Sequence, residues 1–106
     1  MRALIVVENG AIAPPPDQLP MLIQAFKAWR NKWRDKMEAF EFFAGRGGGW
    51  GVFNTSDETE FSQAMMEFPL NPFSTVAVHP TVDGDDALNR LGETINAMLS
   101  EMQKGQ

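Results

Sequence analysis

A glycine-rich stretch between two aromatic segments constrains the fold of this chain more than any other feature. It spans residues 41–54 and reads EFFAGRGGGWGVFN. A dinucleotide fingerprint needs glycines at its first, third and sixth positions, but the sixth position here is Trp50 or Val52, depending on the first glycine chosen. No Gly-Lys-Ser/Thr follows to form a P-loop. Because β-prone residues flank the glycines, the stretch predicts a β-hairpin with strands at about 38–45 and 50–54.

Apolar patterning places the other elements around this hairpin. A short run with β-branched content is typical of a strand covered on both faces, and apolar residues recurring every three or four positions predict amphipathic helices. The remaining predicted elements are a strand at 3–7, a helix at about 18–36, a helix ending at Phe68, a strand at about 73–79 and a last helix at about 84–103.

Polar residues supply candidate caps for the three helices. Asp17 is a candidate N-cap for the first helix, with Pro20 tolerated in its first turn. Thr55 and Glu58 have the spacing of a capping box. Several aspartates at 83–86 offer N-caps for the last helix, whose narrow apolar seam favours docking on the sheet or on a partner subunit.

The order of these elements predicts the fold class. Two split βαβ halves give an α+β protein with a ferredoxin-like plait (β-α-β-β-α-β) and an extra C-terminal helix. We expect one domain over residues 1–106, with its core at 1–80. The strand at 3–7 is apolar on both faces, so a second copy packed sheet to sheet would cover the face that the helices leave open. This predicts a homodimer, a dimeric α+β barrel enclosing a space between its subunits.

Charge and composition exclude several classes of function. The net charge of −5 and the pI near 4.7 oppose binding to nucleic acid or to an anionic membrane, and no apolar run is long enough to span a bilayer. The absence of cysteine excludes disulfides and thiolate metal sites and suits a cytoplasmic protein. Lysines and arginines interleave with Trp29 and Trp33, but helical spacing predicts that the tryptophans pack on the sheet while the cations face solvent.

The region from 40 to 80 resembles the muconolactone isomerase-like family of the dimeric α+β barrel superfamily. The matching residues are Ala44-Gly45, Val52-Phe53, the helix around 61–68 and the PLNPF segment at 69–73. The resemblance implies the plait fold, a face-to-face dimer that often builds a larger ring, and a pocket between sheet and helices. It also implies cofactor-free proton transfer on an unsaturated lactone, in the breakdown of aromatic compounds. Independently of the resemblance, one histidine without cysteines or clustered carboxylates supplies too few ligands for a metal site.

The sequence departs from that family where catalysis would take place. Ala39 and Arg46 stand at the two positions where the family carries histidines, and the strand at 73–79 lacks the family's acidic residues. The isomerase activity therefore receives no support from individual positions.

Two residues are candidates for acid-base chemistry. Glu41 stands among aromatic residues, where burial would raise its pKa toward that of a general acid or base. It would equally suit an edge strand, where a charge discourages aggregation. His79, the only histidine, is a candidate proton relay or carboxylate anchor, or else a surface residue.

Four further residues are candidates for contact with a ligand. Arg46 would pair with a ligand carboxylate and Trp50 would stack on a flat ring, with Phe43 and Phe73 lining an apolar cavity. The alternative places Arg46 in solvent and Trp50 in the core. The sequence thus predicts a binding protein for a small aromatic or lactone-like metabolite, with isomerase activity as the family resemblance implies. The alternative hypothesis is a non-catalytic homo-oligomeric interaction module.

Overall fold

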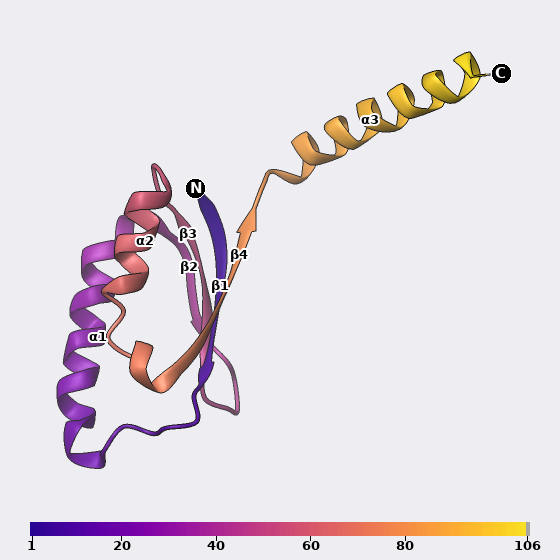
Figure 1. The fold of residues 1–106 in the computed structure, drawn as a ribbon. Helices are drawn as coiled ribbons and strands as arrows, with labels where there is room; N and C mark the ends of the chain where they lie inside the picture. The colour runs from indigo at the N-terminus through magenta and orange to yellow at the C-terminus, as the bar shows by residue number, and fades with distance from the viewer. Residues whose placement is uncertain (106) are drawn as a thin grey trace.

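Four antiparallel strands form one sheet, with two helices against one of its faces and a third helix apart from it (Figure 1). The computed structural model describes residues 1–105. The elements are β1 (Arg2–Asn9), α1 (Leu19–Trp33), β2 (Met37–Phe42), β3 (Gly49–Asn54), α2 (Glu58–Met66), β4 (Ser74–Thr81) and α3 (Gly84–Lys104). Short 3₁₀ turns precede α1, follow α1 and precede β4.

The strand order β2-β3-β1-β4 is that of a ferredoxin-like plait, which confirms the predicted fold class. β1 lies in the centre, with Ile5 opposite Gly51 of β3 on one side and Val78 of β4 on the other. The predicted hairpin joins β2 to β3, and its register shifts between Met37 and Ala39.

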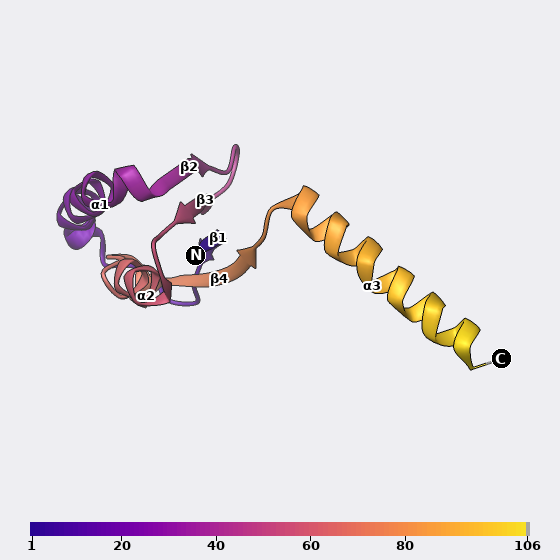
Figure 2. The same ribbon diagram turned by 90° about the horizontal axis from the view of Figure 1, so that it is seen from above.

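Strand alternation divides the sheet into an inner face toward the helices and an outer face that neither α1 nor α2 covers (Figure 2). Ala3, Ile5 and Phe53 point inward and are buried. Leu4 and Val52 are paired across β1 and β3 and share the outer face. β1 is therefore apolar on both faces, as its sequence predicts.

The two tryptophans of α1 tie the helix layer to the core. Both are buried, and the indole of Trp29 lies 5.0 Å from the ring of Phe68, measured between centroids. The Trp29 indole N–H donates to the carbonyl of Ala64 in α2 at 2.9 Å, and the Trp33 indole N–H donates to the Glu67 carboxylate at 2.9 Å. The prediction that these tryptophans pack on the sheet is confirmed, and each N–H finds an acceptor, as buried indoles require.

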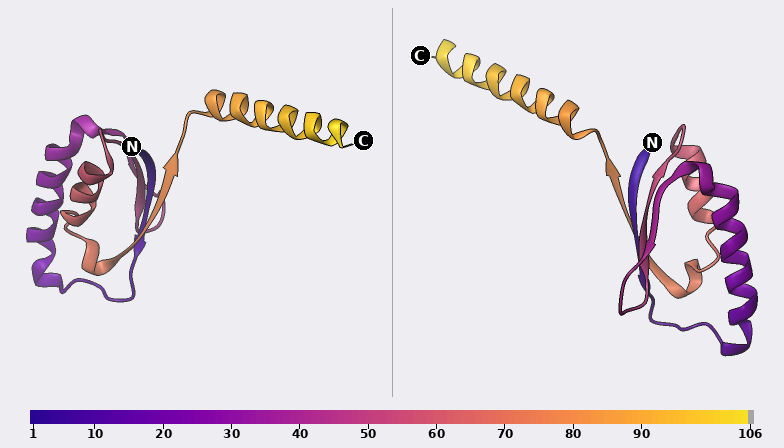
Figure 3. Two further views of the ribbon diagram at one scale, coloured as in Figure 1. Left: turned by 45° about the horizontal axis from the view of Figure 1, so that its top comes forward. Right: turned by 180° about the vertical axis from the view of Figure 1, so that it is seen from behind.

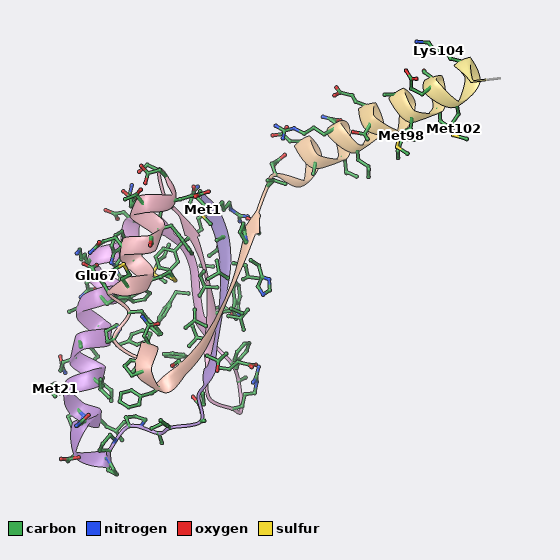
Figure 4. The ribbon with its side chains drawn as sticks, viewed as in Figure 1. Met1, Met21, Glu67, Met98, Met102 and Lys104 are labelled. Atoms are coloured by element: carbon green, nitrogen blue, oxygen red, sulfur yellow. The ribbon has the colours of Figure 1, made fainter. Side chains whose placement is uncertain are left out.

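Glu67, at the end of α2, joins the two helices on their outer side (Figure 4). Its carboxylate accepts hydrogen bonds from Lys32, Gln63 and Trp33. The hydrogen bond from Lys32 contributes most to lowering the pKa of the Glu67 carboxyl below its ordinary value.

Two of the predicted helix caps are wrong. Asp17 lies inside a 3₁₀ turn (Pro16–Gln18), and no side chain caps α1, because Pro16 starts a turn before the helix proper begins. Thr55 is buried, and its hydroxyl donates to the carbonyl of Asp57 at 3.0 Å. The carboxylate of Asp57 caps α2 instead, accepting from the N–H of Glu60 at 2.8 Å.

α3 begins after an N-cap at Asp83 and extends away from the sheet and from α1 and α2 (Figures 1 and 3). The molecule consequently measures 72 × 28 × 23 Å. α3 has no buried residue, so its apolar seam does not dock on the sheet of its own chain. Among residues 1–105, no helix combines the length and the apolar character needed to cross a membrane.

Candidate ligand-binding pocket

A cavity of about 750 Å³ opens between α1 and the inner face of the sheet, beside the edge strand β2. Its walls are mainly aliphatic and aromatic and come from segments far apart in sequence. The apolar lining consists of Pro14, Leu19, Leu22, Ile23, Phe26, Phe40, Phe42, Leu70 and Phe73. A concave apolar site of this size is typical of small-molecule binding.

A second cavity of about 110 Å³ shares Phe26, Phe40 and Phe42 with the first, and its lining includes Gly49 and Gly51 of β3. At Gly49 the neighbouring strand leaves no room for a side chain. A Cβ on Gly49 would lie 2.4 Å from the carbonyl oxygen of Glu41. The glycines of β3 therefore leave the space open.

Phe26 of α1 is the centre of an aromatic cluster at the pocket. Its ring centroid lies 5.7 Å from that of Phe40 and 6.1 Å from that of Phe42 in β2. It also lies 5.6 Å from Phe68 in an edge-to-face arrangement, which is a favoured geometry for aromatic pairs. Phe42 is 69% exposed although it is apolar, so the pocket presents an aromatic surface to solvent.

Three cations from α1 and the turn after it line the same cavity: Lys27, Arg30 and Arg34. The guanidinium carbon of Arg30 lies 4.9 Å from the centroid of the Phe40 ring. Burial, and next the charge of nearby Arg34, lower the pKa of Arg30 below its ordinary value, although the residue stays charged. Arg34 donates to the side-chain oxygen of Asn31 at 3.0 Å.

None of these three cations forms an ion pair with a carboxylate within the described residues. The four ion pairs there are Arg2–Glu38, Lys32–Glu67, Lys36–Glu60 and Arg46–Glu8. The pocket therefore concentrates uncompensated positive charge on a chain whose net charge is −5. An arginine in an apolar surrounding holds a carboxylate more strongly than one in bulk water.

Of the ligand-contacting residues predicted from the sequence, Phe73 lines the larger cavity. Arg46 does not, because its guanidinium lies 4.0 Å from the centroid of Phe43 and pairs with the Glu8 carboxylate at 3.2 Å. Arg46 and Phe43 thus contact each other at the hairpin. Trp50 contributes to the lining of the smaller cavity, but the strand pairing directs its side chain to the outer face of the sheet.

The two predicted acid-base residues do not meet within one subunit. In the sheet register Glu41 is opposite Trp50, Trp50 is opposite Val6, and Val6 is opposite Ala77, two residues before His79. Glu41 and His79 thus lie on the two edge strands of the outer face, three strand spacings or roughly 14 Å apart across the sheet, with His79 two residues further along β4. Their roles as acid and base stay predictions, and turnover by a Glu41→Gln variant is the measurement that would decide them.

Sequence reasoning missed that the cations around Arg30 line a cavity. It assigned them to a solvated helix face because they interleave with tryptophans. Their spacing carries a second signal, since positions 27, 30 and 34 are three and four residues apart and share one side of a helix. That side is next to Phe26 and therefore reaches the pocket.

Among the described residues, no group of three histidines, cysteines, aspartates or glutamates is placed to hold a metal ion. No family model matches the sequence, and neither does any curated protein. The fold does match solved structures. Muconolactone isomerase superposes with a TM-score of 0.69 at 15% identity, over 78% of this chain and 90% of that enzyme.

A second solved structure is 5-chloro-2-hydroxyhydroquinone dehydrochlorinase from Burkholderia phenoliruptrix AC1100, in complex with 2,5-dihydroxybenzoquinone. It superposes with a TM-score of 0.57 at 17% identity, over 81% of this chain and 98% of that one. The chain therefore has the muconolactone isomerase-like fold, which confirms the resemblance found in the sequence.

Proposed function

We propose that this protein binds a small cyclic or aromatic anion in the pocket between α1 and the sheet. The observation that supports it is the placement, around an aromatic cavity of about 750 Å³, of three cations that have no carboxylate partner among residues 1–105. The ring of the ligand would pack among Phe26, Phe40 and Phe42, and its anionic group would face Arg30. Both structural neighbours are named for reactions of small cyclic molecules, which agrees with this ligand class.

Benzoate and benzyl alcohol are suitable probes because they share a ring and differ in charge. We expect benzoate to bind the wild-type protein roughly 10 to 100 times more tightly than benzyl alcohol, since a hydrogen bond to a charged group contributes about 1.5–3 kcal/mol. Replacing Arg30 with glutamine should remove most of that preference and leave the weak affinity for benzyl alcohol unchanged. Isothermal titration calorimetry measures all four affinities.

Arg46→Gln is the matched control, because Arg46 lies outside the pocket at the hairpin. Its affinity for benzoate should equal that of the wild-type protein. Equal binding of the two probes to wild-type protein would contradict the proposal. If only Arg46→Gln lowered the affinity for benzoate, the ligand would instead bind at the hairpin, as the sequence suggested.

We propose further that two copies pack through the outer face of their sheets. The centre of that face is apolar and is formed by Leu4, Val6, Ala39, Trp50, Val52 and Ala77. Ion pairs flank it at both ends, Arg2 with Glu38 at 2.7 Å and Arg46 with Glu8 at 3.2 Å. An apolar centre with a polar rim is the composition of a subunit interface.

A Val6→Asp variant should dissociate this dimer, because the substitution places two unpaired carboxylates at the centre of the interface. Measured in an Ile95→Asp background, in which the exposed seam of α3 cannot hold two copies together, sedimentation velocity would report a shift to the monomer, with circular dichroism confirming that the fold is retained. Gln24→Asp on the exposed side of α1 is the control and should leave the mass unchanged. Wild-type protein that sediments as a monomer at micromolar concentration would exclude the interface.

One observation favours the alternative hypothesis of a non-catalytic interaction module: the exposed apolar seam of α3. Failure of every anionic ring compound to bind, together with stable assembly of the chain, would favour that function over ligand binding.

A further inference from the structure

α3 carries a continuous apolar seam that no other part of residues 1–105 covers. Its members are Leu88, Leu91, Ile95, Met98, Leu99 and Met102, each between 46% and 66% exposed. Met98 and Met102 lie on one side of the helix and Lys104 on the opposite side (Figure 4). Most helices in proteins owe their stability to the packing of such a face rather than to intrinsic propensity.

We propose that α3 pairs antiparallel with α3 of a second copy of this chain, in one defined register. This pairing does not depend on the ligand pocket or on the sheet interface. Two features on the two flanks of the seam select both the orientation and the register.

The first feature is Gly92 in the middle of α3. Glycine weakens a helix interior relative to alanine, and a Cβ added at Gly92 would meet nothing within 4 Å, so no contact within the described residues requires this glycine. Leu99 lies seven residues later on the same flank of the seam and is 49% exposed. In an antiparallel pair each Leu99 fills the notch over the partner's Gly92, and the two-fold symmetry makes this contact twice.

The contact between Leu99 and the partner's Gly92 determines which apolar residues of the two helices face each other. Ile95 packs against the partner's Met98, and Leu91 packs against the partner's Met102. Shifting the register by one heptad toward the N-terminus would instead place Gly92 opposite the partner's Gly92 and leave a hole. The register chosen here covers the four apolar layers from 91 to 102 without such a gap.

The second feature is a pair of opposite charges on the other flank of the seam, Arg90 and Glu101. Neither is in an ion pair within residues 1–105. The register set by Gly92 and Leu99 places Arg90 within about two residues, or 3 Å along the axis, of the partner's Glu101. The same pairing repeats by symmetry, so packing on one flank and charge on the other indicate one arrangement.

The orientation can be measured because the native chain has no cysteine. Asn89, Asn96 and Gln103 are seven residues apart and lie on one side of α3, away from the seam. Three full-length variants, Asn89→Cys, Asn96→Cys and Gln103→Cys, each carry one nitroxide label, and pulsed electron spin resonance gives the distance between copies.

The antiparallel register predicts axial offsets of about 22 Å at 89, 1.5 Å at 96 and 20 Å at 103, from a rise of 1.5 Å per residue. The distance at 96 should therefore be the shortest of the three. Equal distances at all three positions would mean parallel helices and would overturn the proposal. The absence of any distance between copies at 96 would also overturn it.

Charge exchange tests the register separately. In the Asn96→Cys background, Arg90→Glu should broaden or remove the short distance, and adding Glu101→Arg should restore it. Ile95→Asp should remove the short distance at 96, and the paired exchange of Arg90 and Glu101 should not restore it. A distance at 96 that survives Ile95→Asp would show that the labels approach through another interface, which contradicts pairing through the seam.

Discussion

Replacing Phe53 with alanine is expected to lower the free energy of unfolding by about 3–5 kcal/mol, because the deletion leaves a cavity in the core that the sheet cannot close. Phe53 is 1% exposed on the inner face of β3. Its ring centroid lies 5.7 Å from that of Trp29 in α1 and 6.2 Å from that of Phe61 in α2. One ring therefore joins both helices to the sheet.

Urea denaturation measures this loss as a lower midpoint at an unchanged slope. Phe42→Ala is the matched control, since it deletes the same side chain from a site that is 69% exposed. Its cost should be on the order of 1 kcal/mol or less. Similar losses in the two variants would mean that Phe53 is not at the centre of the core.

A Gly48→Ala variant is expected to lose roughly 2–5 kcal/mol, from backbone strain together with a steric clash. Gly48 has a φ of +89°, which side chains of L-amino acids rarely adopt. A Cβ at this position would lie 2.4 Å from the carbonyl oxygen of Val7, and backbone atoms of the central strand cannot move away cheaply.

Gly45→Ala separates the two causes. Gly45 has a similar φ of +77°, but a Cβ there would meet nothing within 4 Å. In Gly45→Ala only the backbone strain lowers the free energy of unfolding, by about 1–2 kcal/mol. The same denaturation curves compare the variants, and an equal loss at the two glycines would show that the contact with Val7 costs nothing.

The fold could be predicted because the sequence patterns that indicate its strands, helices and hairpin are local. The glycines between aromatic segments predicted the hairpin, and the order of strands and helices then allowed few topologies. The position of α3 was not predictable in this way. Its seam indicates that it packs against something, but sequence spacing cannot tell whether the partner is the same chain or another copy.

The candidate site was only partly predictable, because a shift of one residue in strand register moves every side chain to the other face. Phe73 lines the larger cavity, whereas the side chains of Glu41 and Trp50 point to the outer face of the sheet. Arg30 was missed for a different reason. Within the part of the chain that the structure describes, Arg30 has no carboxylate partner, and this depends on residues distant in sequence that no local pattern reports.

The glycines of β3 have a consequence for how a ligand would associate. Where Gly49 and Gly51 line the smaller cavity, its floor is peptide backbone, and backbone in the middle of a sheet has no rotamers to lose when it is covered. The side chains that lose conformational entropy when a ligand binds are then the phenylalanines of α1 and β2. We expect the floor to be the same with and without ligand, so that selectivity among ring shapes depends on the walls.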